Sequence, residues 1–187
     1  MDALIVADTN KMQFAISDVL NRVKIDCTVC SNAAEARRAA LVRSFDIFII
    51  NGGLSDERGN ELAINLADTF DCGGIYIDDY MIIDMFSDEL GSSGVISLVR
   101  PITKSTLADM VRIVTVANAR VRNLKEQNEK LSAKLDDLKY ISRAKIALMH
   151  SLGYTEEQAH KFIEKKSMDM RISRRQVAMD ILKTYEE

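Results

Sequence analysis

Cysteine and histidine are the residues whose spacing most readily signals metal or redox chemistry, and this chain holds few of them. Cys27 and Cys30 form a C-x-x-C pair, a spacing found at zinc and thiol–disulfide sites. The surrounding residues are typical of a β-strand, on which side chains three apart point to opposite faces. No second pair follows, and His150 and His160 lie far along the chain. We therefore predict buried, apolar cysteines, no metal site and no cofactor.

Catalytic arrangements are equally hard to find. The sequence shows no Ser-His-Asp or Cys-His arrangement and no Gly-rich phosphate-binding loop. A dinucleotide site would need G-x-G-x-x-G after the first apolar run, which instead ends Ala7-Asp8-Thr9-Asn10. We therefore expect a protein that is not an enzyme.

Charge is unevenly distributed over the 187 residues. The net charge is −3, with 28% charged and 47% hydrophobic residues. Residues 1–105 carry a net charge of −7 and residues 106–187 a net charge of +4. A basic C-terminal part on an acidic protein predicts a polyanionic partner for that part. The sequence contains no run of 18 apolar residues, no signal-peptide pattern and only three cysteines, so we expect a cytoplasmic protein.

The elements that would position these residues follow from hydrophobic patterning. Strand-type apolar runs occur at 3–7, 27–30, 46–50, 74–77 and 95–99, and helical patterns between them at 12–23, 33–42, 61–69 and 80–89. Continuously apolar strands alternating with helices predict a parallel sheet covered on both faces. We therefore expect an α/β domain over residues 1–105.

This order of elements resembles the receiver domain of bacterial response regulators, a flavodoxin-like fold with five parallel strands. In that family an acidic pair follows the first strand, a phospho-accepting Asp ends the third, a Thr or Ser ends the fourth and Lys-Pro follows the fifth. The resemblance places Asp8, Asn51, Asp78 and Arg100 at these four positions.

Several of these residues depart from the family pattern. An Asn51 amide is not the carboxylate nucleophile that an aspartyl phosphate requires. Magnesium prefers anionic oxygens, of which the site would offer chiefly Asp8 and Asp78. The Thr or Ser hydroxyl is absent, and Ser97 occupies the place of the aromatic switch residue. We therefore predict a pseudo-receiver with a degenerate phosphorylation site, open to a regulatory protein partner.

A heptad pattern without Gly or Pro spans residues 107–138. Apolar residues recur three and four apart, which is the seam of a coiled coil, and an Asn at one seam position favours a single register. We expect residues 107–117 to cap the first domain and residues 106–138 to form a dimerisation helix. The predicted dimer seam consists of Val121, Leu124, Asn128, Leu131, Leu135 and Leu138. Basic residues flank the seam and would repel across a parallel pair unless acids or a polyanion offset them: Arg120, Lys125, Lys134 and Lys139.

The remaining residues, 139–187, predict a small three-helix module. The heptad helix continues to about Leu152 and ends at Gly153. Capping boxes at Thr155–Gln158 and Ser173–Gln176 start two further helices. Their predicted inner faces carry Ala159, Phe162, Ile163, Val177, Ala178, Ile181 and Leu182.

This stretch resembles the ANTAR family, a three-helix RNA-binding module of transcription antitermination regulators. The match is carried by Ile141, Arg143-Ala144-Lys145, Leu148-Met149, Gly153, Thr155-Glu156-Glu157, Ala159, Ser167-Met168 and Val177-Ala178. Ile146 replaces a common Gly, and His160 replaces a common aromatic residue. The order of receiver-like domain, coil and module adds to the resemblance.

The basic residues of the module are the candidates for RNA contact. Arginine forks onto phosphates and stacks on unpaired bases, and a helix N-terminus adds backbone donors. The predicted RNA-binding set is Arg143, Lys145, Lys165, Lys166, Arg171, Arg174 and Arg175. The alternative for each of them is a solvated basic face.

Taken together, the resemblances imply a homodimeric regulator that binds hairpins in a nascent mRNA leader and prevents terminator formation. Two alternatives stay open from the residues. Capped helices joined by a short turn are also typical of DNA-binding helix-turn-helix modules. A coiled-coil signalling adaptor that binds no nucleic acid would show the same heptads.

Overall fold

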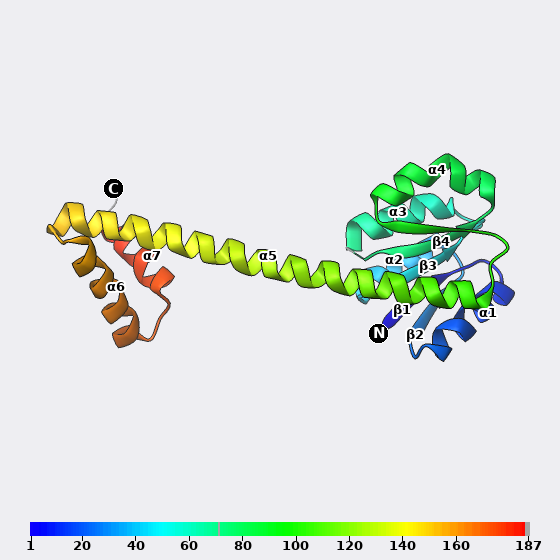
Figure 1. The fold of residues 1–187 in the computed structure, drawn as a ribbon, viewed down its shortest axis with the longest axis horizontal. Helices are drawn as coiled ribbons and strands as arrows, with labels where there is room; N and C mark the ends of the chain where they lie inside the picture. The colour runs from blue at the N-terminus through cyan, green and yellow to red at the C-terminus, as the bar shows by residue number, and fades with distance from the viewer. Residues whose placement is uncertain (71, 186–187) are drawn as a thin grey trace. The chain divides into compact units, whose positions relative to one another are not determined.

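The computed structural model describes residues 1–70 and 72–185, which form two compact units, Met1–Arg122 and Asn123–Glu187. The first unit is built on a five-stranded sheet of order β2-β1-β3-β4-β5 with all neighbours parallel (Figure 1). The strands are β1 Asp2–Val6, β2 Asp26–Cys30, β3 Ile47–Asn51, β4 Gly74–Asp78 and β5 Val95–Val99. The predicted parallel α/β fold is confirmed.

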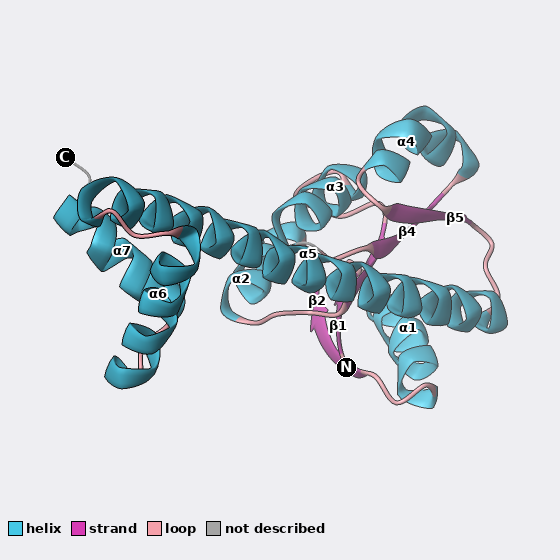
Figure 2. Ribbon diagram, turned by 60° about the vertical axis from the view of Figure 1, so that its left-hand side comes forward, coloured by secondary structure: helices cyan, strands magenta, loops and turns pink. Residues whose placement is uncertain are grey.

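Helices cover both faces of the sheet (Figure 2), and the continuous hydrophobicity of the central strands is the reason. The helices of this unit are α1 Asn10–Arg22, α2 Ala33–Val42, α3 Gly59–Phe70 and α4 Tyr80–Ser92, together with the start of α5. Alternate residues of β3 enter opposite core layers. Phe48 and Ile50 pack with α2, α3 and α4, whereas Ile47 and Ile49 pack with α1 and α5.

The two cysteines of the C-x-x-C pair lie on β2. Cys30 is buried and Cys27 is partly buried, and both are free thiols. Burial raises the pKa of both thiols, which disfavours the reactive thiolate.

Helix α5, Lys104–Leu152, contributes to both units. Its first turns close the core of the first unit through Leu107, Val111 and Val114. Heptad spacing from Leu107 also places Met110 and Ala117 on this packed stripe, but Met110 is only partly buried and Ala117 is exposed. Val111 and Asn118, one position further along, pack there instead, so the stripe keeps the seven-residue spacing but is turned about the helix axis.

An amide continues the packed stripe of α5. The Nδ2 of Asn118 donates to the carbonyls of Asp46 and Gly73, each at 3.0 Å. Because these carbonyls lie next to β3 and β4, this side chain fixes α5 against one end of the sheet.

The second unit contains the rest of α5 with α6 Glu156–Met170 and α7 Arg174–Tyr185. Gly153 ends α5 with a φ of 69°, and Thr155 and Gln158 form the predicted reciprocal capping box. The core comprises Ala144, Ala147, Leu148, Ala159, Ile163, Val177, Ala178, Ile181 and Leu182. The predicted three-helix module is confirmed, with Phe162 only partly buried. The expected domain limits at residues 105 and 138 stay predictions.

None of the helices in the described part of the chain combines the length and the apolarity that a membrane span requires.

Candidate functional site

The residues expected at the degenerate phosphorylation site lie at the carboxyl ends of the parallel strands. Asn51 ends β3 and Asp78 ends β4. Arg100 follows β5, and its backbone N–H donates to the carbonyl of Asp78 at 2.9 Å. Asp8 follows β1 and is exposed. Parallel strands therefore bring Asn51, Asp78 and Arg100 to one edge of the sheet.

Asp78 is the centre of a buried polar cluster. Its Oδ1 accepts hydrogen bonds from Arg100 Nη2 at 2.9 Å and from the Asp79 backbone N–H at 2.8 Å. Its Oδ2 accepts one from the hydroxyl of Tyr76, a fully buried residue two positions earlier on β4. A Cβ at Gly52 would overlap this carboxylate, so glycine is the residue that lets β3 approach it.

The environment of Tyr76 keeps it protonated. Burial raises the pKa of its hydroxyl, and the hydrogen bond to Asp78 raises it further. The phenol is therefore a permanent donor to the carboxylate, and Asp78 has hydrogen-bond donors on both oxygens.

Asn51 lies beside this cluster with its hydrogen-bonding capacity partly unused. The side chain is 5% exposed, and its Nδ2 donates to the Gly52 carbonyl at 3.2 Å. Within the described part of the chain, Asn51 Oδ1 and Arg100 Nε are buried without a hydrogen-bond partner. An amide in this position supplies neither a nucleophilic carboxylate nor an anionic metal ligand.

These residues do not fit a magnesium ion. Two of the four residues are acids, Asp8 and Asp78. Asp8 is exposed, and Asp78 is paired with Arg100. Among residues 1–70 and 72–185, no group of three or more His, Cys, Asp or Glu side chains could hold a metal ion. Chemically, the cluster can stabilise the strand ends and the loops that follow them.

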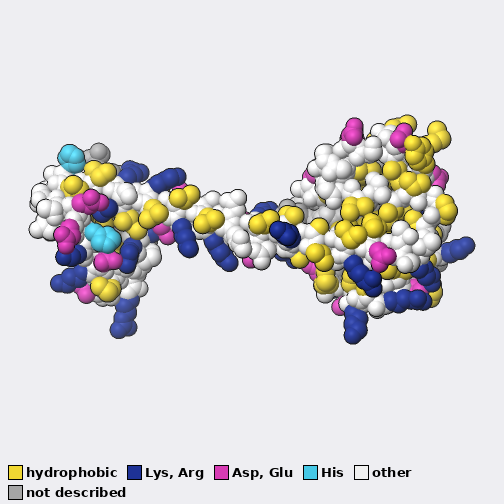
Figure 3. Space-filling model, viewed as in Figure 1, with side chains coloured by type: hydrophobic (Ala, Val, Ile, Leu, Met, Phe, Trp, Pro, Cys, Tyr) yellow, Lys and Arg dark blue, Asp and Glu magenta, His cyan; other side chains and the backbone are white. Residues whose placement is uncertain are grey.

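The predicted dimer seam lies on an exposed part of α5. Val121, Leu124, Leu131, Leu135 and Leu138 are each 55–60% exposed, and Asn128 is exposed with them. Apolar side chains can be seen along this helix in yellow (Figure 3). Lys139, one of the flanking cations, pairs with Asp136 at 3.2 Å on the same helix. This exposed stripe can bury apolar area only by associating with another surface.

Three of the predicted RNA-binding residues form ion pairs with carboxylates. Lys145 pairs with Glu156 at 2.7 Å, Arg174 with Glu164 at 2.7 Å and Arg175 with Asp137 at 3.2 Å. The hydrogen bond from Lys145 lowers the pKa of Glu156. Lys145 is mostly buried, with 20% of its side chain exposed, so its first role is to join α5 to α6.

The other four basic residues lie on different parts of the module. Arg143 lines a groove that also contains Arg175. Lys166 lies over the ring of Phe162, 5.7 Å from its centroid. Lys165 is exposed on α6, and Arg171 ends α6 in a left-handed conformation with a φ of 53°. Lys and Arg side chains, dark blue in Figure 3, are distributed over the surface of this unit.

The basic set predicted for RNA contact left out two residues beside it, and Tyr140, which could also stack on a base, was expected to serve in packing. Lys139 and Tyr140 line the same groove as Arg143 and Arg175. The signal was available, because Asp136, Lys139, Tyr140 and Arg143 are three or four apart and so share one helix face. Sequence spacing alone does not show that α7 closes the other side of this face.

Comparisons with known proteins agree with both units. The ANTAR domain family matches residues 129–182. No curated protein matches the chain.

Solved structures similar to the chain include receiver domains of response regulators. The chemotaxis response regulator CheY4 of Vibrio cholerae is 18% identical with a TM-score of 0.53, over 60% of this chain and 97% of that one. A Francisella receiver domain is 20% identical with a TM-score of 0.56, over 62% and 97%. The receiver domain of an HD domain-containing protein from Pseudomonas fluorescens Pf-5 is 14% identical with a TM-score of 0.60, over 65% and 91%.

At these identities the structural similarity establishes the fold of the first unit, while the family match covers most of the second. The chain therefore combines an N-terminal unit of the receiver fold with a C-terminal ANTAR domain.

Proposed function

We propose that this protein is a cytoplasmic, RNA-binding regulator of transcription antitermination that acts as a homodimer. The observation that carries the proposal is the ANTAR match over residues 129–182, in a unit whose surface presents arginines and lysines from all three helices. ANTAR modules are RNA-binding modules of antitermination regulators. The dimer binds hairpins in a nascent transcript and prevents the terminator from forming.

Dimerisation is supported by the exposed seam on α5. Five apolar side chains at heptad spacing are more than half exposed in the single chain, and each would be covered in a two-stranded coil. Asn128 at a seam position favours the pairing of two helices in one register. Two modules held by one coil would bind two hairpins, and the linkage would raise affinity through effective concentration.

Control without phosphorylation is supported by the cluster around Asp78. The Asn51 amide stands in the place of the phospho-acceptor. Arg100, in the place of the Lys, is paired with the carboxylate of Asp78. We therefore assign regulation to a partner protein, a ligand or protein abundance.

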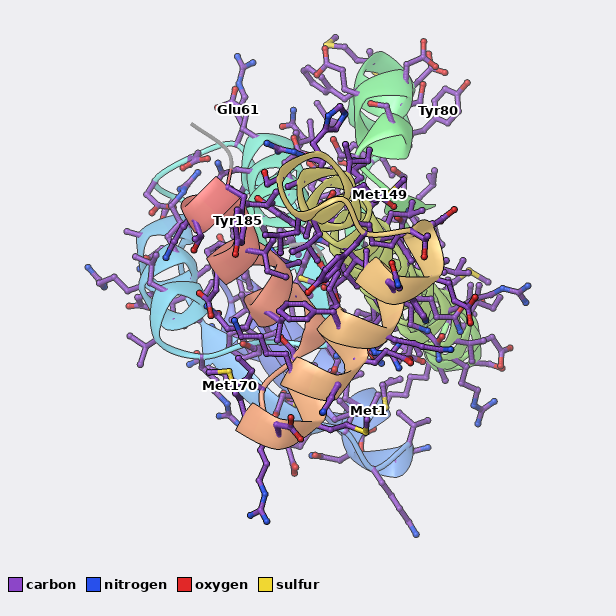
Figure 4. All side chains as sticks on the ribbon, turned by 90° about the vertical axis from the view of Figure 1, so that its left-hand side faces the viewer. Met1, Glu61, Tyr80, Met149, Met170 and Tyr185 are labelled. Atoms are coloured by element: carbon purple, nitrogen blue, oxygen red, sulfur yellow. The ribbon has the colours of Figure 1, made fainter. Side chains whose placement is uncertain are left out.

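A surface on α4 is available for a regulatory protein. Tyr80, Met81, Ile82 and Met85 are exposed apolar residues on this helix, and Tyr80 projects from it into solvent (Figure 4). Beneath them lies a groove of about 490 Å³ whose walls include Leu54, Phe86 and the buried Tyr76.

The experiment that tests the function is a binding comparison with the full chain. The probes are an RNA with two small-loop hairpins and a DNA duplex of equal length, each measured across a salt series. We expect preference for the RNA, with affinity that falls as salt rises because phosphate contacts release counterions. The double variant Arg174→Ala/Arg175→Ala should lose most of this affinity.

Two outcomes would contradict the proposal. Preference for duplex DNA would favour a helix-turn-helix factor. Binding to neither nucleic acid at low salt would leave the adaptor alternative. A terminator read-through assay with purified polymerase then separates RNA binding from antitermination.

A further inference from the structure

A groove opens on the second unit where the outer face of α5 meets the first turn of α7. Its volume is about 530 Å³, and it is lined by Asp136, Lys139, Tyr140, Ser142, Arg143 and Arg175. Three of these six residues are cationic and one is aromatic. Neither Lys139 nor Tyr140 belongs to the basic set that the sequence predicted.

The aromatic ring in the groove is already in contact with a cation. The guanidinium carbon of Arg175 lies 5.1 Å from the centroid of the Tyr140 ring. Asp137 holds the same guanidinium through an ion pair at 3.2 Å, so the cation is fixed over the ring. Tyr140 is partly buried against the core of the module, which restricts the motion of the ring.

The charges around the ring favour an anion. The groove is lined by three cations, Lys139, Arg143 and Arg175, and by one carboxylate, Asp136. Asp136 pairs with Lys139 at 3.2 Å, and Asp137 pairs with Arg175. The groove therefore combines an aromatic ring with a lining of mainly cationic side chains, which suits a nucleobase attached to phosphates better than an apolar ligand.

A second hollow on the same unit gives a useful contrast. It is lined by Tyr154, Gln158, Lys161, Phe162 and Lys165. There the two rings pack edge to face against each other, with centroids 5.9 Å apart and an angle of 65°. These two rings pack against each other and Lys166 lies over the Phe162 ring, whereas the ring of Tyr140 has the planar guanidinium of Arg175 over it.

The groove lies next to the proposed dimer seam on α5. With Leu131 and Leu138 at d positions of the heptad, Asp136 and Arg143 fall at b positions and Tyr140 at an f position, which face away from a coiled-coil partner. Lys139 falls at an e position beside the seam, and Ser142 falls at the a position that follows the last seam residue. Dimerisation through the seam would therefore leave Tyr140 and Arg143 accessible.

We propose that this groove binds one unpaired nucleotide of a single-stranded RNA loop. The base stacks against the Tyr140–Arg175 pair, and Lys139 and Arg143 bind the flanking phosphates. The inference rests on the proposed RNA-binding function and assigns Tyr140 as the residue that contacts a base.

The test uses the full chain and a pool of RNA hairpins with randomised loops, from which bound RNA is selected and its affinity measured. Tyr140→Leu keeps apolar packing but removes the π-face, and Tyr140→Phe keeps the ring. We expect Tyr140→Leu to weaken binding about tenfold or more, and Tyr140→Phe to bind like the wild type. Tyr185→Leu, at a tyrosine 39% exposed on the last turn of α7, is the matched control and should change affinity less than about twofold.

A salt series separates stacking from phosphate contact. Tyr140→Leu should leave the slope of log Kd against log salt unchanged, whereas Arg143→Gln should reduce it by about 0.7 to 1. Ultraviolet crosslinking with mass spectrometry should find a nucleotide adduct on the peptide that contains Tyr140. Thermal unfolding by circular dichroism verifies that each variant folds.

The possible failures are distinguishable. If the wild type selects no RNA from the pool, the proposed function and this inference both fall. If it selects RNA but Tyr140→Leu and Tyr140→Phe bind equally tightly, the groove is not a base-binding site, while the proposed function stands. Equal losses in Tyr140→Leu and Tyr185→Leu would also overturn the assignment.

Discussion

Arg100 stands where the receiver pattern has Lys, and within this fold it is paired with the carboxylate of Asp78. Asp78 is 8% exposed and accepts hydrogen bonds from three donors. We predict that Asp78→Asn destabilises the first unit by about 2–4 kcal/mol, because it leaves the Arg100 guanidinium without its counter-ion. Hydrogen exchange of β4 peptides in the full chain measures this loss.

Asp79→Asn is the matched control for this substitution. Asp79 is the next residue along the chain, but its side chain is 73% exposed and 4.0 Å from Arg100. An exposed pair of this kind contributes less than about 1 kcal/mol. Equal effects of the two substitutions would show that the buried ion pair is not the source of the stability.

The same cluster also decides whether an Asp at position 51 could act as a phospho-acceptor. We expect that Asn51→Asp alone does not produce a phosphoprotein with acetyl phosphate, because the Asp78 carboxylate keeps the Arg100 guanidinium in an ion pair and away from a phosphoryl group. Asn51→Asp/Asp78→Thr releases this cation, supplies a hydroxyl and should label more readily. Intact-protein mass spectrometry distinguishes the two variants, and labelling of the single variant or of the wild type would contradict the assignment.

At the scale of residues, the sequence predicts where a residue lies along its strand but not which side chains it contacts. Asn51 and Asp78 could be placed at strand ends because the apolar runs stop there. The hydrogen bond from Tyr76 to Asp78 could not be predicted, because Tyr76 reads as an ordinary member of an apolar strand. In the same way, a carboxylate partner for Arg174 or Arg175 requires knowing which helices meet.

At the scale of elements, the heptad pattern of α5 predicts that the helix packs on the sheet but not which side faces it. The heptads continue without interruption through residues 107–138, yet the sheet contacts Leu107, Val111 and Val114 and then Asn118. These residues keep the seven-residue spacing, but Val111 and Asn118 lie one position after the residues that the heptad seam would place there, so the packed stripe is turned about the helix axis. The strands were easier to predict, because burial on both faces makes each a continuous apolar run.

An acidic side chain fastens α5 to the sheet and makes the first unit sensitive to acid. The Oδ2 of Asp46 accepts from the backbone N–H of Asp2 at 2.9 Å, and its Oδ1 accepts from Arg122 Nη2 at 2.9 Å. These contacts, that from Asp2 first, lower the pKa of Asp46. A lowered pKa stabilises the fold above the unfolded-state value of about 3.9, and this stability is lost as pH falls through the folded-state pKa.

We predict that Asp46→Asn destabilises the first unit by about 1–2 kcal/mol at neutral pH. It should also flatten the fall in stability below about pH 4. Urea unfolding of the full chain at a series of pH values, followed by circular dichroism, measures both effects. Asp109→Asn removes an exposed carboxylate that pairs only along α5, with Arg112 at 3.2 Å, and should behave like the wild type. A steeper acid dependence in Asp46→Asn would contradict this role.

At the scale of the whole molecule, the exposed seam predicts the oligomeric state. Leu131→Glu places a charge at a d position and should convert the dimer to a monomer, whereas Ala133→Glu at the outward f position should not. Asn128→Leu removes the polar register residue and should strengthen association while allowing other oligomers. Analytical ultracentrifugation reads all three variants, and a wild type that stays monomeric at high concentration would remove the dimer from the proposal.

The last prediction joins the dimer to RNA binding. If each module binds one hairpin, an RNA with two hairpins should bind the wild-type dimer about a hundredfold more tightly than an RNA with one, because the second contact is intramolecular. Leu131→Glu should lose this advantage and bind both RNAs with the affinity of the single-hairpin complex. Tyr140→Leu should instead weaken both complexes and keep a gain from the second hairpin, since the coil is intact. A two-hairpin advantage that persists in a monomeric variant would mean that one module contacts both hairpins, and the coil would then need another role.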